Sequence, residues 1–349
     1  MSTTIKNFSA KNMDWRKSLR ENNNKSKIVI AIFFLIYASL GLLLDVFFVS
    51  EKYPNANLSD IFQALVTFQM FPTITFIMLG IAGVSLFVTI TLNNRLMLLG
   101  TKYKEINPNT AKTPEETQLY NVVEELKIAA GLRYMPKIYI IKADYMNAFA
   151  SGYSEKSAMV AITQGLIQKL NRSELQAVMA HELSHIRHMD IKLTLVASLL
   201  ANLTIMILDI FFYRMIFGSR NSSDKKGNIL VMIILVLRYL LPVINIVLLL
   251  YLSRTREYMA DAGCVQLTRD NKPLATALIK INEDHFTNKD AYKEQYQSTP
   301  HETARREAYI FDPAQAGIKD LSSLNDAFST HPNIKDRLKA LGFKHNDTK

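Results

Sequence analysis

Cysteine is nearly absent from this chain of 349 residues: Cys264 stands alone, so no intramolecular disulfide can form. A chain without disulfides suits a reducing compartment such as the cytosol. Internal repeats and low-complexity tracts are also missing. The net charge of +10 is not accompanied by a basic stripe interleaved with aromatic residues, which argues against nucleic-acid binding. Membrane topology and attraction to a lipid surface explain this charge better.

Long apolar runs are plentiful. Each of four runs is long enough to cross a bilayer, which takes roughly 20 residues at about 1.5 Å per residue. They cover residues 28–49, 71–92, 193–217 and 229–252. A signal peptide is a poor alternative for the first run, because its apolar region is usually shorter and ends at a cleavage site of small residues. Buried core helices are the other alternative, and it weighs most for the last two runs.

Charged residues inside the later runs need an explanation, because an unpaired charge in hydrocarbon is costly. Asp209 and Arg214 lie in the third run, and Arg238 lies in the fourth. If these runs form an antiparallel hairpin, Asp209 and Arg238 lie at similar depths and can pair. Two charges without a relay or an inverted repeat do not support the alternative of an ion pathway.

The distribution of lysine and arginine predicts how the chain is oriented in the membrane. Residues 1–27 contain seven of these residues, whereas the loop at 50–60 contains only Lys52. The second run is followed by Arg95, Lys102 and Lys104. We therefore expect the N-terminus and the chain from residue 93 onward to face the cytoplasm, with the 50–60 loop outside.

Between and after these runs the chain is predicted to be mostly helical with a small sheet. Apolar residues in 115–132 recur with the helical period, and Gly131 marks a helix end. A strand is expected at 136–141 and a hairpin or irregular pair of strands at 147–163. The polar stretch after residue 282 is expected on the surface, and a further helix is expected at 253–282.

The segment "AHELSHIRHMD", residues 180 to 190, concentrates metal-binding side chains. His181 and His185 are four residues apart, so on a helix they share one face and can bind one ion. Zn²⁺ accepts two imidazole nitrogens, and for catalysis it needs a third protein ligand and an open position. Glu182 lies about 100° around the helix, close enough to reach a water on the ion without binding the ion. This is the geometry that a zinc site of the HExxH type requires.

The alternative is a solvated polar helix face, and two observations argue against it. A chance match to HExxH is rare in a chain of this length. The motif also falls on a helix that Ser173 and Gln176 are predicted to open as a capping box. His188 lies roughly 10 Å along the axis from His181, too far to share its ion. We interpret His188 as a supporting or surface residue.

A third ligand is expected in "SRTREYMADAGC", residues 253 to 264. Glu257 and Asp261 are four residues apart and stack on one helical face. One carboxylate can bind zinc while the other accepts the N–H of a zinc-bound histidine. Two candidate spans separate this segment from His185, so the chain returns to the side it left. Alone the pair is a weak signal, because solvated helices often carry such pairs.

Four segments together resemble the HtpX family of membrane zinc metalloproteases, relatives of the Ste-type prenyl-protein proteases. They are "MNAFASG", "AHELSHIRHMD", "SRTREYMADAGC" and "STHP". The resemblance implies a gluzincin-type endopeptidase with its active site at the cytoplasmic face of a bacterial inner membrane. It implies one Zn²⁺ per subunit, held by His181, His185 and Glu257, with Glu182 as the catalytic base and Asp261 as the partner of a ligand. It also implies a substrate-binding edge at Asn147, Ala148, Phe149 and Ala150.

His331, in "STHP", has two possible roles besides that of a capping histidine before a proline turn. It could donate to the developing oxyanion, or it could occupy the open zinc position in a latent state. The expected substrates are misfolded or surplus membrane proteins, bound as an extended strand against a sheet edge. The nearest rival enzyme, a prenyl-protein protease, would have more spans enclosing a chamber. A membrane scaffold with an inactive site is the rival outside the enzymes, and the intact motif argues against it.

The expected fold is thus a mainly α membrane protein of about four transmembrane helices with a cytoplasmic α+β zinc metalloprotease domain containing a small sheet. The first predicted segments are a cytoplasmic arm at 1–27 and a transmembrane pair at 28–92. The protease domain begins at 105–192, which includes the HExxH helix. A transmembrane or membrane-associated hairpin follows at 193–252, and 253–349 completes the protease domain with the third ligand.

Overall fold

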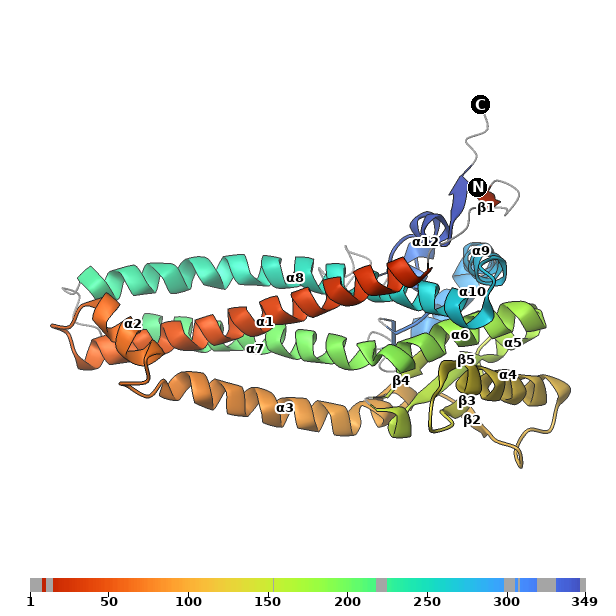
Figure 1. Cartoon of the computed structure of the whole chain (residues 1–349), viewed down its shortest axis with the longest axis horizontal. Helices are drawn as coiled ribbons and strands as arrows, with labels where there is room; N and C mark the ends of the chain where they lie inside the picture. The colour runs from red at the N-terminus through yellow and green to blue at the C-terminus, as the bar shows by residue number, and fades with distance from the viewer. Residues whose placement is uncertain are drawn as a thin grey trace. The chain divides into compact units, whose positions relative to one another are not determined.

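The computed structural model describes residues 8–10, 15–152, 154–217, 225–297, 305–306, 308–318 and 331–345. The chain forms two compact units (Figure 1). The mixed unit consists of Met1–Ser26, Ile90–Lys192 and Leu250–Lys349. The helical unit consists of Lys27–Thr89 and Leu193–Leu249. Each unit is therefore assembled from segments that are distant in the sequence.

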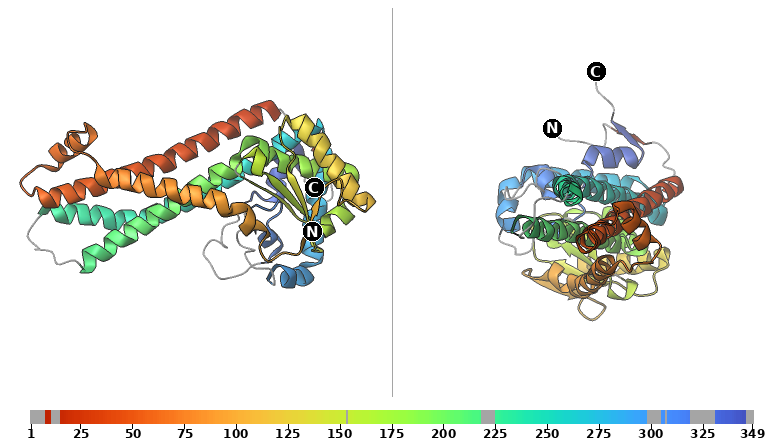
Figure 2. Two further views of the ribbon diagram at one scale, coloured as in Figure 1. Left: turned by 90° about the horizontal axis from the view of Figure 1, so that it is seen from below. Right: turned by 90° about the vertical axis from the view of Figure 1, so that its left-hand side faces the viewer.

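The helical unit is built from four long helices that run alongside one another (Figure 2). They are α1 (Trp15–Lys52), α3 (Thr73–Leu98), α7 (Asp190–Phe217) and α8 (Lys225–Thr268). The short helix α2 (Leu58–Val66) lies between α1 and α3. Aromatic contacts join α1 to α7, where the rings of Phe48 and Phe211 meet edge to face with centroids 5.4 Å apart.

Three helices among the described residues are long and apolar enough to cross a membrane: Arg20–Lys52, Val196–Tyr213 and Ile229–Thr268. They coincide with three of the four predicted runs. The fourth run, 71–92, lies within α3, whose apolar part Thr73–Ser85 is shorter than a span among the described residues. Three of the four predicted spans therefore have counterparts among the described residues, and a span at α3 stays a prediction.

Three charged residues in the apolar runs have specific partners. The buried carboxylate of Asp45 on α1 accepts hydrogen bonds from the backbone N–H groups of Ile74 and Thr75, at 2.8 and 2.9 Å. These N–H groups belong to the first turn of α3, where backbone N–H groups have no acceptor within their own helix. Arg238 on α8 donates to Asp209 on α7 at 3.0 Å, so the predicted pairing is confirmed. The guanidinium of Arg238 also lies over the Phe212 ring, 3.6 Å from its centroid.

A four-stranded sheet forms the centre of the mixed unit, with the order β2-β3-β5-β4. Its strands are β2 (Tyr103–Ile106), β3 (Lys137–Ile141), β4 (Ala148–Ser151) and β5 (Met159–Thr163). β3 and β5 are parallel, and the two outer pairs are antiparallel. The strand predicted at 136–141 and the strand pair predicted within 147–163 are confirmed. A separate pair of strands, β1 (Phe8–Ala10) and β6 (Phe343–His345), joins the two ends of the chain.

Helix α6 (Arg172–His188) is the most buried helix of the mixed unit and packs against α4, α9, β4 and β5. It carries the segment that holds the HExxH motif. The other helices of this unit are α4 (Pro114–Ala130), α5 (Gln164–Lys169), α9 (Lys272–Thr287), α10 (Lys289–Gln297) and α12 (Ile334–Ala340), with the 3-10 turns Glu155–Ser157 and Pro313–Ala316. The predicted end of α4 is confirmed, because Gly131 is its left-handed C-cap with φ of 71°.

The predicted capping box of α6 is wrong by two residues. Asn171 is the N-cap, and its side chain accepts from the backbone N–H of Glu174 at 3.0 Å, while Glu174 accepts from the N–H of Asn171. Ser173 already lies inside the helix and donates its hydroxyl to Asn171. An asparagine followed three residues later by a glutamate satisfies the same free N–H groups as a serine with a glutamine. The local sequence contains both pairs of residues, Asn171 with Glu174 and Ser173 with Gln176.

Candidate metal centre

Helix α6 and the part of α8 from Leu250 onward, which belongs to the mixed unit, supply the metal-binding side chains. His181, Glu182 and His185 project from α6, and Glu257 and Asp261 project from α8. The two helices approach closely at Gly263, where an added Cβ would lie only 1.8 Å from the Ser184 hydroxyl oxygen. Any larger side chain at this position would separate the helices.

His181, His185 and Glu257 bring one donor atom each to within 4.8 Å of one another. The two Nε2 atoms lie 3.2 Å apart. Each Nε2 lies 3.6 Å from a different oxygen of Glu257. Ligands about 2.0–2.1 Å from a tetrahedral ion are roughly 3.3–3.5 Å from each other, so the spacing fits zinc. Two imidazoles and one carboxylate are also a donor set that catalytic zinc sites use.

Asp261 contacts the far side of the His181 ring. Its Oδ1 lies 3.0 Å from His181 Nδ1, so it accepts the N–H there and leaves Nε2 free to face the other donors. Arg337 on α12 donates to both oxygens of Asp261, at 2.6 and 3.0 Å. Although burial opposes the imidazolium, hydrogen bonds to Asp261 and Glu257 raise the pKa of His181 to about 9. This chain of contacts fixes the tautomer and the orientation of the His181 ring.

Glu182 is completely buried, and neither of its carboxylate oxygens has a hydrogen-bond partner among the described residues. Burial raises the pKa of this carboxyl, although His181 and His185 oppose the rise. A buried carboxyl without a partner is rare, because the unpaired group costs desolvation free energy. Its position beside the three donors is that of a residue that handles a proton at the centre.

Arg337 is a functional residue that sequence reasoning missed. Besides Asp261, its guanidinium donates to the backbone oxygen of Ile310 at 2.7 Å and lies 3.4 Å from Glu257. The residue is buried, although arginine is seldom found inside a protein without charged partners. In the sequence it occupies an ordinary polar position of a short helix near "STHP", and no local pattern marks it.

His331 is brought to the same centre. Its Nδ1 lies 3.4 Å from Glu257 Oε2, and the side chain is buried. Although burial opposes its charged form, Glu257 and Asp312 raise the pKa of His331. The N-cap of the following helix is Asn333, not His331, which removes the capping role from consideration. The oxyanion role and the latency role both remain predictions.

His188 is not part of the donor group. Its Nδ1 faces the backbone oxygen of Ser184 at 2.8 Å, one turn earlier on the same helix. The ring is half-buried and lies beside Gly263, so it supports the contact between α6 and α8. The geometry agrees with its interpretation as a supporting residue.

The expected substrate edge, Asn147–Ala150, is buried and is already paired by the chain itself. The backbone N–H of Ile310 donates to Ala148 O at 2.9 Å, and Phe149 forms an antiparallel bridge with Tyr309. The amide of Asn147 donates to Phe311 O at 2.9 Å. β4 ends the four-stranded sheet, and these contacts continue the sheet by one short segment. A substrate strand could pair along residues 147–149 only after this segment had left.

The sequence model of Peptidase family M48 matches residues 114–343. The "Protease HtpX homolog" of Helicobacter pylori (strain Shi470) is 40% identical over 329 residues, which is 94% of this chain and 98% of that protein. The protein of the same description from Bacteroides fragilis is 30% identical over 328 residues, which is 92% of this chain and 95% of that protein.

The comparison with solved structures gives a further match. It is the crystal structure of Ste24p from S. mikatae, with a TM-score of 0.48 and 20% sequence identity. The similarity covers 90% of this chain and 65% of that chain.

Proposed function

Because the chain belongs to Peptidase family M48, we propose that it is a zinc-dependent endopeptidase that cleaves misfolded or surplus membrane proteins at the cytoplasmic face of a bacterial inner membrane. Proteolysis itself follows from the family, and the proposal adds the ion, the substrate class and the location. The observation that supports it best is the buried donor group His181, His185 and Glu257 with the unpaired carboxyl of Glu182 beside it.

The residues of the centre divide the chemistry among them. Zinc held by the three donors would acidify water and polarise the scissile carbonyl. Glu182 takes the proton from the attacking water and delivers it to the departing amine. Its raised pKa makes the carboxylate a stronger base in the first step than an exposed glutamate would be. Asp261 and Arg337 hold the His181 ring in the tautomer that presents Nε2.

Two features support the membrane location and the substrate class. Three described helices have the length and composition of membrane spans. Lysine and arginine are concentrated in residues 1–27 and again after the second apolar run, which favours a cytoplasmic position for the donor group. A peptidase held at this surface meets the cytoplasmic loops of other membrane proteins. The family and the complete set of donors argue against an inactive scaffold.

The decisive experiment compares wild type with Glu182→Gln on an unfolded model membrane protein, with bound zinc measured in both. Glu182 lies beside the ion and does not hold it, so the variant should keep zinc while cleavage disappears. His188→Gln is the matched control from the same helix, and it should keep both. Cleavage by Glu182→Gln at the wild-type rate would overturn the assignment of the base. Wild type that binds no zinc would overturn the assignment of the ion.

The orientation has its own test, in a Cys264→Ser background and intact cells. Ala56→Cys should react with an impermeant thiol reagent added from outside, and Thr110→Cys should not. The two positions lie on opposite sides of α3 in the sequence. Labelling of Thr110→Cys from outside would reverse the proposed orientation.

A further inference from the structure

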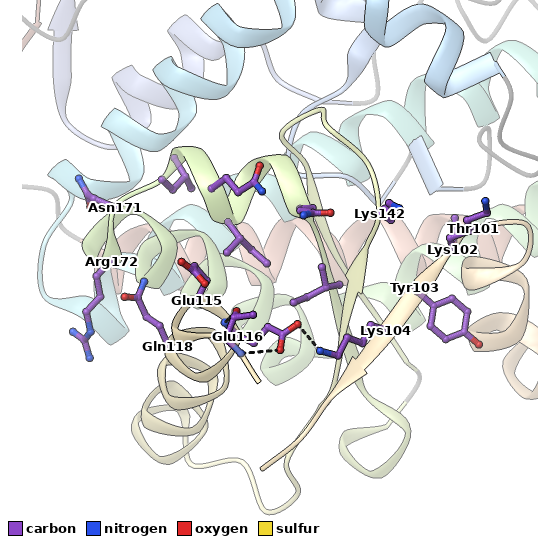
Figure 3. Close-up of a pocket in the computed structure, with 16 residues that line it drawn as sticks. Thr101, Lys102, Tyr103, Lys104, Glu115, Glu116, Gln118, Lys142, Asn171 and Arg172 are labelled. Carbon is purple, nitrogen blue, oxygen red and sulfur yellow. Dashed lines mark hydrogen bonds and ion pairs between the residues drawn. The ribbon is translucent and has the colours of Figure 1, made fainter. Parts of the chain in front are cut away.

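A groove lies on the mixed unit between the β2–β3 part of the sheet and the first turns of α4 and α6 (Figure 3). Its volume is about 1090 Å³, and its lining does not include any donor of the metal centre. We call it the basic groove, after the cations Lys102, Lys104, Lys142 and Arg172 that line it. Figure 3 shows Lys102 and Lys142 together at one end and Arg172 at the other.

Three of these cations share one face of the sheet. The antiparallel register of β2 and β3 places Tyr103 opposite Ile141 and Lys104 opposite Ile140. The bond from Lys142 N to Lys102 O, 2.9 Å long, continues this pairing by one residue. Lys102 therefore lies opposite Lys142, two residues from Lys104 on the same face. Like charges directly opposite each other destabilise a sheet, so this end of the groove favours an anion.

Two carboxylates line the groove, Glu115 and Glu116, and both belong to the first turn of α4 and not to the end with Lys102 and Lys142. Lys104 is paired with Glu116, whose pKa this hydrogen bond lowers, and Arg172 is paired with Glu125 at 2.9 Å. Neither Lys102 nor Lys142 takes part in an ion pair with another described residue. Two of the four cations are thus already paired, and the two that are not lie opposite each other.

Chain connectivity places this end of the groove close to the end of an apolar helix. α3 ends at Leu98, and Lys102 follows four residues later. Four residues span at most about 14 Å, so Lys102 cannot lie farther than that from the helix end. If the apolar run 71–92 crosses the bilayer as proposed, the six helical residues after it add about 9 Å, so Lys102 lies within about 23 Å of the membrane edge on the cytoplasmic side, whose leaflet is rich in anionic lipid.

The rest of the lining suits an amphiphile. Ile140, Ile167 and Leu170 supply apolar surface, and Gln164 and Gln168 supply amide donors between the two charged ends. A free inorganic anion would use only the lysines, whereas a lipid would also use the apolar surface and the amides. We propose that the basic groove binds the headgroup of an anionic phospholipid, with its phosphodiester on Lys102 and Lys142. The proposal rests on the membrane location of α3 and not on the peptidase chemistry.

The test measures binding of dihexanoyl-phosphatidylglycerol to the full-length protein in neutral detergent by isothermal titration calorimetry. Dihexanoyl-phosphatidylcholine and inorganic phosphate are the comparison ligands. Saturable binding of phosphatidylglycerol alone is expected. In Lys102→Gln/Lys142→Gln the dissociation constant should rise about tenfold or more, since each basic residue contributes on the order of a few-fold to tenfold. The control Lys127→Gln/Lys137→Gln removes the same charge from the same unit outside the groove and should bind like wild type.

Several outcomes would overturn the proposal. An equal loss in both double variants would mean general surface charge, and equal binding of inorganic phosphate would mean a free-phosphate site. Equal binding of phosphatidylcholine would mean that the charge of the headgroup does not determine binding. The groove variant should cleave substrate in neutral detergent at the wild-type rate, because neither lysine lies in the metal centre. Inactive wild type with normal lipid binding would count against the proposed function and leave this inference standing.

Discussion

Asp261 Oδ1 lies 3.0 Å from His181 Nδ1, and the two residues are brought together although 80 positions separate them in the sequence, from 181 to 261. The carboxylate is held on its other side by Arg337 at 2.6 Å. The orientation of one metal donor thus depends on a residue from the C-terminal part of the chain. Substitution of Asp261 or Arg337 should therefore have measurable effects on zinc binding and on stability.

The first prediction concerns Asp261 and Arg337. Asp261→Asn should weaken zinc binding by about 10–100-fold, because the partner that orients a metal-bound histidine is typically worth that much. Arg337→Met removes the guanidinium from the buried Asp261 carboxylate, which then keeps only the His181 N–H, and should lower the free energy of unfolding by about 3–5 kcal/mol. Competitive zinc titration and thermal unfolding measure the two effects. Arg133→Met, at an exposed position of the same unit, is the control. If Arg337→Met lowered the free energy of unfolding no more than Arg133→Met does, the proposed contact of Arg337 with Asp261 would be wrong.

The second prediction concerns pH. Zinc must displace a proton from the imidazolium of His181. Although burial opposes the charged form, hydrogen bonds to Asp261 and Glu257 raise the pKa of His181 to about 9. Apparent zinc affinity should therefore rise with pH up to about 9 and level off above it. Titration against a chelator at several pH values measures this slope. A pH-independent affinity below pH 9 would contradict the raised pKa.

The metal-free protein should show the opposite trend in stability. A histidine whose folded pKa exceeds its unfolded value of 6.5 stabilises the fold fully below pH 6.5. This contribution declines as the pH rises and is lost as it passes about 9. Asp261→Asn removes one of the hydrogen bonds that raise the pKa and should flatten both pH trends.

The third prediction tests the close approach of α6 and α8. Gly263→Ala would place a Cβ 1.8 Å from the Ser184 hydroxyl oxygen and 2.8 Å from its Cβ. Overpacking of this kind costs about 1–3 kcal/mol, and moving the helices apart should also weaken zinc binding. Ser184→Gly removes both clashing atoms, so the double variant should recover much of the loss in thermal unfolding. A Gly263→Ala protein as stable as wild type would show that the helices do not meet so closely.

The fourth prediction concerns the pair in the helical unit. Asp209 and Arg238 are joined at 3.0 Å, so each single alanine variant should leave one charge without its partner. The loss in the double variant should be smaller than the sum of the two single losses, with a coupling of about 0.5–3 kcal/mol. Unfolding of the detergent-extracted protein measures the cycle. Strictly additive losses would mean that the pair is not formed in solution.

The fifth prediction separates the two roles of His331, which lies 3.4 Å from Glu257. If it donates to the oxyanion, His331→Ala should lower kcat by about 10²–10³-fold while zinc binding stays near wild type. If it holds the zinc ion in a latent state, the same variant should raise activity and weaken zinc binding. Steady-state kinetics with a zinc titration distinguish the roles. If His331→Ala had the kcat and the zinc affinity of wild type, neither role of His331 would hold.

Local patterns in the sequence were enough for much of the fold and for most of the centre. The i, i+4 spacing of His181 and His185, the end of α4 at Gly131 and the strand at 136–141 depend on backbone periodicity and on residue conformational preference. These properties act over a few residues, so they are legible in a linear sequence. The predicted pairing of Asp209 with Arg238 also depended only on counting helical rise within two neighbouring runs.

Other features were decided by tertiary structure, because they arise between segments that are far apart in the chain. Arg337 reaches Asp261 across a separation of 76 residues, and Asn147 reaches Phe311 across 164. No short-range pattern marks such contacts; they form because packing α6, α8 and α12 together buries charged groups that must then find partners. The sequence thus determined which side chains can bind zinc. Only the folded chain determined which residues orient them and that the edge of β4 is already paired by its own segment.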